Sequence, residues 1–338
     1  MIVFNAATGQ RAGSAGRQGV ARRSNPIGRI VGNHNVQGYL YIAPWLFGFI
    51  VFGLKPLIEL IYHSFTKYNL YLPPQWVGPK NYQDILTNDP IFGQVAQNMV
   101  IYVVGATIVS IVVALFFATL LARDFHGNHV FRIIIYVPSL LIGTATGALF
   151  KQVFRGDENG LANMFLHLFG VGPVNWITNY DQPVFVLVPL ILVNLWFIGG
   201  GMIIFLAGIK SIPPSLYEAA QMDGAGAWRC FRTVTLPLLA PVIIFNTIMT
   251  LIGHLQVFET PLIFATSGGM TGTDVLGYHY NLAFFLTYLY RVAFIDGDFG
   301  YGSALAVIIF AVALILTVIV LWVGRRYTYY GQQLAEAE

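Results

Sequence analysis

Long apolar runs alternate with short polar segments along most of the chain. An α-helix needs about 20 mainly apolar residues to cross the hydrocarbon core of a bilayer. Six runs reach that length, and they cover residues 38–62, 95–122, 131–151, 184–209, 236–258 and 302–323. The pattern therefore predicts an all-α polytopic membrane protein with six transmembrane helices.

A seventh apolar run, residues 277–294, reads GYHYNLAFFLTYLYRVAF. Tyr and Phe are abundant in it, and aromatic residues favour the interface between membrane and water. If this run also crossed the bilayer, Arg325 and Arg326 would lie on the outer side, against the preference of basic residues for the cytoplasm. We therefore expect an interfacial or re-entrant helix on the outer side, with a true seventh span as the open alternative.

Composition agrees with a membrane protein. Of the 338 residues, 56% are hydrophobic and only 10% are charged, against about 25% charged in soluble domains. The net charge of +3 is too small to suggest a nucleic-acid partner. The single cysteine, Cys230, excludes an internal disulfide framework. His126 and His129 have the only metal-like spacing, but too few further ligands surround them for zinc, so no metal is predicted.

The basic residues predict the orientation of the spans. With the N-terminus inside, twelve Lys and Arg residues fall on the cytoplasmic side and five on the outer side, as expected for cytoplasmic loops. Residues 1–37 are rich in Gly, Ser and Arg and predict a disordered basic cytoplasmic arm. Residues 38–325 form the transmembrane domain, and residues 326–338 a cytoplasmic tail. Both termini are thus expected to be cytoplasmic.

The polar segment 211–237, between the fourth and fifth runs, has the signals of a folded loop. Ser211 can cap a helix, and Pro213 and Pro214 suit its first turn, where a missing N–H costs nothing. Gly224 can end that helix with a positive φ, and Gly226 allows the chain to turn again. A second short helix is expected over residues 227–233, with the fifth span starting at proline 237.

The side chains of this loop suit contact with a partner. Ala219 and Ala220 let a partner approach closely, and Glu218 offers a charge to a basic group. A local role is the alternative for Glu218, because with Ser215 it forms a capping-box pattern. Asp223, in turn, is an ordinary residue for the end of a helix. Two further residues, Arg229 and Arg232, suit either docking or simple anchoring on the cytoplasmic side.

The loop carries a recognisable spacing. Glu218-Ala219-Ala220 is followed after three residues by Gly224, and after nine more by Val234-x-Leu236-Pro237. This resembles the EAA-x3-G-x9-I-x-LP loop of the membrane subunits of binding-protein-dependent ABC importers, with Val234 in place of Ile.

Other segments follow the same family's order, most closely that of the larger maltose and glycerol-3-phosphate importer permeases. They include VGPKNY at 77–82, Asn194-x-Trp196 and FGYGSA at 299–304. Met270 departs from the usual Pro, and the long outer domain of the maltose subunit is missing.

The resemblance implies a type I ABC importer fold with a cytoplasmic coupling-helix loop. It implies that the chain forms the path for a sugar or oligosaccharide delivered by an extracytoplasmic solute-binding protein, in a bacterial cytoplasmic (inner) membrane. A second permease would complete a heterodimer, and two ATP-binding subunits would drive it. The positions expected to couple to the ATPase are Glu218, Ala219, Ala220, Asp223, Gly224 and Gly226.

The chain is not expected to be an enzyme or to bind a cofactor itself. It has no GxxxxGK[ST] sequence to hold ATP phosphates, so the partner ATPase would use ATP and Mg²⁺.

Polar groups inside spans are costly and often mark a transport path. The predicted substrate contacts combine hydrogen-bonding groups with aromatic faces, as sugars require, and they are Asn194, Trp196, His254, Gln256 and Phe258. Glu259 is a further polar candidate. The alternative for each is hydrogen bonding between helices. Glycines 199–201 indicate either a loosened helix or close packing, and small residues there favour a larger ligand.

Two other classes remain possible at this stage. A secondary transporter driven by protons or sodium would need an intramembrane acid or ion site, often within inverted repeats. Glu259 is the only deep acid, and no repeat is visible. A membrane-embedded enzyme would need a nucleophile or metal constellation, which the sequence lacks. The solute itself stays open, because phosphorylated polyols use the same scaffold as sugars.

Overall fold

The computed structural model describes residues 34–123, 125–177, 183–266 and 275–336. The chain divides into two compact units, Met1–Leu57 and Ile58–Glu338. Apart from a hairpin of two-residue strands, regular structure in the described residues is helical. This confirms the predicted all-α class.

The described residues of the first unit are helical, and the helix in which this unit ends, α3, continues into the second unit. α2 covers His34–Phe49 and contains Pro44, and a π-helical turn, Ile50–Leu54, leads into α3, Lys55–Ser64. The predicted arm, residues 1–37, lies outside the described residues except for its last four positions, where α2 begins.

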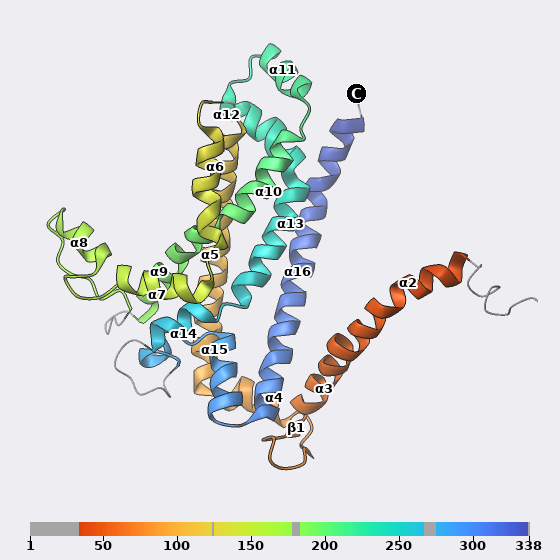
Figure 1. The fold of residues 1–338 in the computed structure, drawn as a ribbon, viewed down its shortest axis with the longest axis vertical. Helices are drawn as coiled ribbons and strands as arrows, with labels where there is room; N and C mark the ends of the chain where they lie inside the picture. Colours follow the sequence, from red (N-terminus) through yellow and green to blue (C-terminus); the bar gives the residue numbers. More distant parts are fainter. Residues whose placement is uncertain (1–33, 124, 178–182, 267–274, 337–338) are drawn as a thin grey trace, which may run out of the picture. The chain divides into compact units, whose positions relative to one another are not determined.

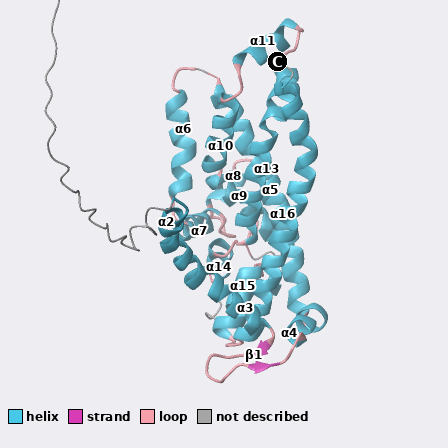
Figure 2. Cartoon of the chain, turned by 90° about the vertical axis from the view of Figure 1, so that its right-hand side faces the viewer, coloured by secondary structure: helices cyan, strands magenta, loops and turns pink. Residues whose placement is uncertain are grey.

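The second unit is a helical bundle (Figures 1 and 2). Its helices are α4 Lys80–Gln83, α5 Pro90–Ala122, α6 Asn128–Tyr136, α7 Gly143–Val153, α8 Leu161–His167, α9 Leu187–Asn194, α10 Gly199–Lys210, α11 Pro214–Met222, α12 Ala227–Cys230, α13 Leu236–Leu255, α14 Glu259–Ala265, α15 Phe285–Tyr290 and α16 Phe299–Glu336. Strands β1, Thr66–Lys67, and β2, Gln75–Trp76, pair antiparallel. In both views α11 lies at one end of the bundle, and β1 and α4 lie at the other.

The apolar runs became helices, but not all are straight. Four helical stretches are long and apolar enough to cross a membrane: Tyr41–Ser64, Pro90–Ala122, Ala227–Ala265 and Phe299–Arg325. Two bent pairs bring the number to six if each pair counts as one span. Asn128–Leu140 and Gly143–Val153 meet at 100°, and Leu187–Phe197 and Gly199–Lys210 meet at 51°. The α16 helix continues through the predicted tail as far as Glu336.

The sharp bend corrects the expectation of one continuous third helix over 131–151. The helix narrows to a 3₁₀ turn at Val137–Leu140, which contains Pro138, and Leu141 and Ile142 are then extended. Proline removes a backbone donor and ends the regular hydrogen-bond ladder. The helix α7 therefore starts afresh, in a direction that crosses the bundle.

A second correction concerns the start of the fifth span. We expected a separate short helix over 227–233 and a new helix at Pro237. Instead, α12 runs through a π-helical turn, Phe231–Thr235, into α13 without a break. A proline leaves the carbonyl four residues earlier without its donor, and π-bulges are a usual way for a helix to absorb such a defect. A π-turn also precedes Pro56.

The doubtful run 277–294 contains only a short apolar helix, Phe285–Ile295, formed by α15 and a π-helical turn. A span needs about 20 residues. This helix is too short to cross a bilayer, in agreement with the prediction that the run does not span.

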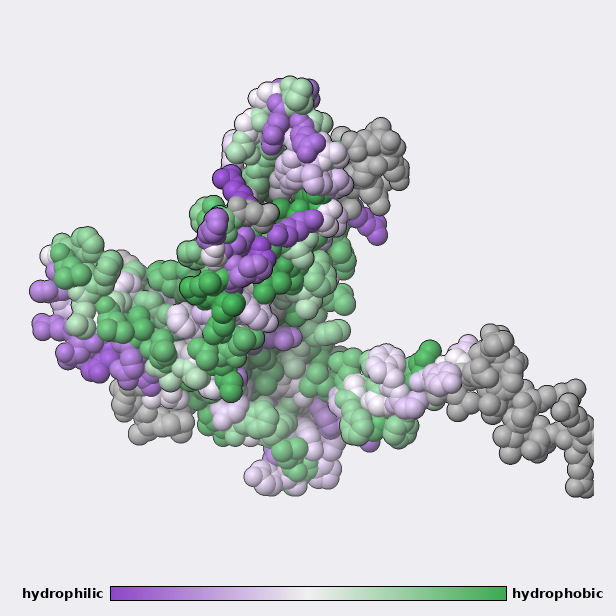
Figure 3. All heavy atoms as spheres, turned by 45° about the horizontal axis from the view of Figure 1, so that its top comes forward, coloured by the Kyte–Doolittle hydropathy of each residue, from purple (hydrophilic) through white to green (hydrophobic). Residues whose placement is uncertain are grey.

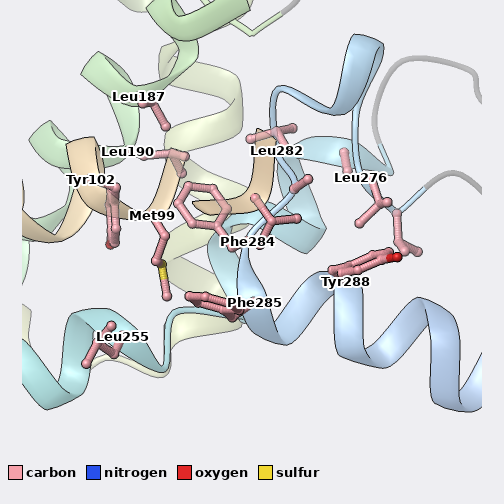
Figure 4. Close-up of a cluster of buried hydrophobic side chains, with 14 of the residues drawn as sticks. Met99, Tyr102, Leu187, Leu190, Leu255, Leu276, Leu282, Phe284, Phe285 and Tyr288 are labelled. Carbon is pink, nitrogen blue, oxygen red and sulfur yellow. The ribbon is translucent and has the colours of Figure 1, made fainter. Parts of the chain in front are cut away.

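The core surrounds α5. A large cluster of buried side chains joins α5 to α9, α13, α15 and α16, and Tyr102, Leu190, Leu255 and Phe284 belong to it (Figure 4). A second cluster joins α5 to α10 and α13 nearer α11. The helix α5 therefore contacts one helix or more of each bent pair, together with α13 and α15.

Asp89 fastens the start of α5. One carboxylate oxygen, Oδ1, caps the helix by accepting from the backbone N–H groups of residues 91 and 92, at 2.8 and 3.2 Å. The other, Oδ2, accepts from the hydroxyl of Tyr301 at 2.6 Å and from that of Tyr288. Burial, with the Asp89 carboxylate as acceptor, raises the pKa of Tyr288, so its hydroxyl stays protonated. This one side chain ties α15 and α16 to α5.

Exposed apolar side chains agree with a lipid environment. Along α5 they recur at every fourth position, as Val100, Val104, Ile108, Val112, Phe116 and Leu120. In Figure 3 the flanks of the bundle are mainly hydrophobic, and hydrophilic side chains gather toward the end that carries α11 and in a second group at the left of the view. Such a surface is unusual for a soluble monomer, in which large apolar patches are rare.

Candidate functional site

The loop 211–237 folds at the end of the bundle that α11 occupies. As predicted, a proline begins its first helix: Pro213 is the N-cap of α11 and Pro214 its first residue. The predicted cap at Ser211 was wrong. Ser211 ends the preceding helix, α10, and its hydroxyl donates to the carbonyl of Gly208 at 2.7 Å.

The capping-box alternative for Glu218 is not formed. Ser215 already lies inside α11, and no side-chain hydrogen bond caps this helix.

Gly224 ends α11 with φ +76°, as its position predicted. Asp223 is the C-cap. The N–H of Gly224 donates to the carbonyl of Gln221 at 2.9 Å, and that of Ala225 donates to the carbonyl of Ala220 at 2.9 Å. These two bonds are the Schellman motif, which favours glycine because an L-residue is strained at positive φ.

Gly226 differs from Gly224. Its φ of −71° and ψ of 171° are extended values that any residue adopts. A Cβ at either glycine would meet no atom within 4 Å. Only Gly224 therefore has a conformational requirement for glycine, and the predicted role of Gly226 as a special turn residue lacks that support.

The loop presents a mixed surface. Glu218, Ala219 and Asp223 are exposed, and Ala220 is half-buried. Two large apolar side chains beside them are also exposed, Met222 at 88% and Trp228 at 74%. The sequence analysis did not single out these two residues, although Met and Trp in so polar a segment were a usable signal.

The loop is also braced against the bundle. The hydroxyls of Tyr217 and Thr235 share a hydrogen bond of 3.0 Å between α11 and the π-turn before α13. The rings of Trp228 and Phe231 stack with centroids 5.6 Å apart. The Tyr217–Thr235 bond therefore links α11 to the turn from which α13 begins.

Two adjoining cavities lie deeper in the bundle. One, of about 200 Å³, is lined by Tyr102, Leu190, Val193, Asn194, Phe197, Gly253, His254, Val257, Phe258, Glu259 and Thr260. The other, of about 280 Å³, is lined by Ser110, Ile111, Ala114, Asn194, Phe197, Ile198, Gly201, Asn246, Thr250, Gly253 and His254. Asn194 and His254 border both, so they lie at the junction.

Both junction residues are held in place by hydrogen bonds. The Asn194 amide donates to the hydroxyl of Tyr102 at 3.0 Å and to the carbonyl of Leu190 at 2.8 Å. His254, 8% exposed, shares a 3.0 Å hydrogen bond with the hydroxyl of Thr107. The carbonyl oxygen of Asn194 is not used in these bonds and remains available to a ligand.

Of the other predicted substrate contacts, one lines a cavity and two do not. Phe258 lines the smaller cavity, and its ring contacts that of Tyr290 at 5.5 Å. Trp196 and Gln256 line neither cavity. The ring of Trp196 packs edge-on against Phe150 and its buried Nε1 has no hydrogen-bond partner, whereas Gln256 is exposed at the end of α13.

Five polar residues that line the cavities were missed from sequence: Ser110, Asn246 and Thr250 in the larger one, and Tyr102 and Thr260 in the smaller one. The buried Asn246 amide donates to the carbonyl of Gly201 at 3.3 Å. Asparagine in the middle of the fifth apolar run was the available signal.

The glycine run, residues 199–201, shows both a break in the helix and close packing, which the sequence analysis gave as alternatives. It follows the 51° bend, and a Cβ on Gly199 would lie 2.7 Å from two backbone atoms of residues 135 and 136. Gly200, by contrast, faces open space.

In the described part of the chain, no three His, Cys, Asp or Glu side chains gather in a way that suits a metal ion.

The family whose sequence pattern matches residues 110–329 is described as the binding-protein-dependent transport system inner membrane component. The chain belongs to this family. The permease is 32% identical over 306 residues to the probable ABC transporter permease protein YesP of Bacillus subtilis (strain 168), with 89% of this chain and 94% of YesP covered. It is 35% identical over 259 residues to the lactose transport system permease protein LacF of Rhizobium radiobacter, with 74% and 84% covered.

The fold has a solved counterpart. A chain in the crystal structure of a bacterial ABC transporter involved in the import of the acidic polysaccharide alginate matches with a TM-score of 0.73 and 22% identity. The match covers 89% of the permease and 98% of that chain.

Family membership decides between the classes left open by the sequence. The protein is a multi-pass inner-membrane permease subunit of a binding-protein-dependent ABC importer, and it is not itself the catalytic subunit. The alternatives of a secondary transporter and of a membrane-embedded enzyme are thereby rejected.

Proposed function

We propose that this permease lines the path of an ATP-driven importer for a sugar or oligosaccharide, which a solute-binding protein delivers from outside. The observation that carries the proposal is the exposed helix–glycine–helix of residues 211–237, braced to α13, at the end of a bundle that holds a polar cavity. The protein thus combines a docking surface, the loop 211–237, with a cavity, and the helix α13 connects the two.

The cavity suits a polyhydroxylated ligand. Asn194, His254, Thr250 and Ser110 offer donors and acceptors, while Phe197 and Phe258 offer aromatic surface. Sites for small ligands typically combine a largely apolar lining with a few placed polar groups. The relatives transport lactose, arabinooligosaccharides, and trehalose or maltose, by their names. A sugar is therefore the solute class favoured both by the residues that line the cavity and by the names of the similar proteins.

Coupling follows from the connection between loop and cavity. The partner ATPase would bind ATP and Mg²⁺ and grip α11 through Met222, Trp228 and the EAA residues. Its closure would displace α11, and the Tyr217–Thr235 bond would pass that displacement to α13, whose far end carries His254. A partner that binds one conformation better than the other shifts the population by its differential affinity. ATP-driven closure would thus select one of two cavity states.

Assembly and orientation complete the proposal. A second permease would form a heterodimer with this chain and close the open side of the cavities, and two ATP-binding subunits would dock beneath. With α11 in the cytoplasm, the end of α16 lies on the same side, because both occupy one end of the bundle (Figures 1 and 2). The positive-inside pattern places the N-terminus there as well.

The test is reconstitution of the full importer in liposomes. We expect uptake of a neutral oligosaccharide to need ATP and the solute-binding protein and to survive collapse of the proton and sodium gradients. Asn194→Leu should abolish most uptake, whereas Gln256→Leu, outside the cavities, should leave most of it. Uptake that persists without ATP, or equal effects of both substitutions, would refute the proposal.

A further inference from the structure

One charged side chain stands out in the cavities. Of the described residues that line them, Glu259 carries the only full charge, and no Lys or Arg accompanies it. It is exposed toward the smaller cavity, at the first position of α14. Among the described residues, no hydrogen bond or ion pair engages its carboxylate. The cavity wall therefore has a negative charge without a cationic partner.

The position of this carboxylate has a local cause. A Cβ added to Gly143 would lie 2.1 Å from Oε2 of Glu259, so the absence of a side chain at Gly143 is what makes room for the carboxylate. Gly143 is the first residue of α7, where backbone N–H groups lack helical partners and carry positive partial charge. The start of α7 thus lies beside the acid and brings no opposing side chain that would neutralise it.

We propose that Glu259 makes this cavity select uncharged polyhydroxylated solutes and reject anionic ones, such as uronates and phosphorylated polyols. The inference rests on the proposed function, since it takes the cavity to be part of the translocation path. An anionic group entering the cavity would meet a like charge. At such distances a like charge weakens binding by about tenfold or more. The relative that imports an acidic polysaccharide would then need a different charge at its own site.

A purely structural role makes a different prediction. Acids are common in the first turn of a helix, where they stabilise the helix slightly. In that case substitution of Glu259 would change thermal stability and nothing else. The readout must therefore report the electrostatic potential inside the cavity.

Charged thiol reagents give that readout without any knowledge of the solute. In the assembled importer carrying Cys230→Ser and Thr260→Cys, we compare the labelling rates of trimethylammonioethyl and sulfonatoethyl methanethiosulfonate. Thr260 lines the same cavity as Glu259. The rate ratio of cation to anion should exceed that of free cysteine by about tenfold. Glu259→Gln should remove that excess, Glu259→Asp should keep most of it, and high salt should shrink it.

The matched control is Glu158→Gln, an exposed acid on the outer loop that lines neither cavity. It should leave the labelling ratio unchanged. A ratio that Glu259→Gln does not alter, or that Glu158→Gln alters equally, overturns the proposal.

A second arm uses a matched pair of sugars. Competition by α-1,4-digalactose and by α-1,4-digalacturonate is measured against uptake of the transported oligosaccharide, with the solute-binding protein constant. We expect Glu259→Gln to improve competition by the uronate about tenfold relative to digalactose, and Glu259→Lys to favour the uronate. An unchanged relative competition would overturn the proposal. If labelling shows the negative potential but the importer takes up no sugar, the proposed function fails and the selectivity for sugars fails with it.

Discussion

The most specific prediction concerns two glycines of the loop 211–237, Gly224 and Gly226. Gly224 has φ +76° at the Schellman end of α11, and Gly226 has φ −71°. Neither has an atom within 4 Å of an added Cβ. Replacement by alanine therefore tests backbone conformation alone, free of any clash.

The magnitudes follow from these angles. Placing an L-residue in the left-handed region costs roughly 1–2 kcal/mol of conformational free energy, and Gly224→Ala should destabilise the folded loop by that amount. Gly226→Ala has no such cost and gains about 0.4–1 kcal/mol by restricting the unfolded chain. A penalty of about 1–2 kcal/mol lowers the population of the native loop about 5–30-fold relative to its alternatives. Gly224→Asn should fall between, because asparagine tolerates this region better than alanine.

The assay is the affinity of the purified permease complex for its ATPase subunit, together with substrate-stimulated ATP hydrolysis. We expect both to fall in the order wild type, Gly224→Asn, Gly224→Ala, Gly224→Val, with Gly226→Ala close to wild type. If Gly226→Ala were as harmful as Gly224→Ala, or if the series at Gly224 had no order, the reasoning from φ would be wrong.

Three further predictions concern the bundle. Gly199→Ala should destabilise the detergent-solubilised protein by roughly 1–3 kcal/mol because its Cβ meets backbone atoms. Gly200→Ala, in open space within α10, should keep or slightly raise the melting temperature; equal losses from the two substitutions would contradict the packing. Asp89→Ala should lower the free energy of unfolding by about 1 kcal/mol for the lost helix cap and by a further 1–3 kcal/mol for the two tyrosine hydroxyls left without an acceptor. Asp89→Asn should lower it less. Denaturation measures both, and no loss in either variant would refute the fastening role. Trp196→Phe should keep uptake and stability, because the buried N–H that it removes has no partner; lost uptake in a folded variant would instead mark Trp196 as a ligand contact.

Local signals made part of this structure predictable. The apolar runs predicted the helices because burial of backbone polar groups in lipid leaves few other choices. Pro214 and Gly224 predicted the start and end of α11, since each residue restricts or frees φ in a way that neighbours seldom override. The role of Ser211 was predicted wrongly because its hydroxyl can hydrogen-bond either at the start of α11 or, as it does here, at the end of α10.

Other features depend on contacts between distant residues. Pro138 signals a break, but the sequence shows neither the 100° bend nor the contact of α7 with the distant α14. Asn194 and Tyr102 are 92 positions apart, and only the fold brings them to one cavity. The same holds for Asn246, and for Gln256, whose exposure no local pattern revealed.

The central claim is that the α11 end of the bundle receives the ATPase. The direct measurement places a photocrosslinking amino acid at Met222, 88% exposed in the loop, or at Tyr71, 91% exposed between β1 and β2 at the opposite end. In the assembled importer, position 222 should crosslink to the nucleotide-binding subunit and position 71 should not. Crosslinks to that subunit from position 71, with none from position 222, would contradict the account.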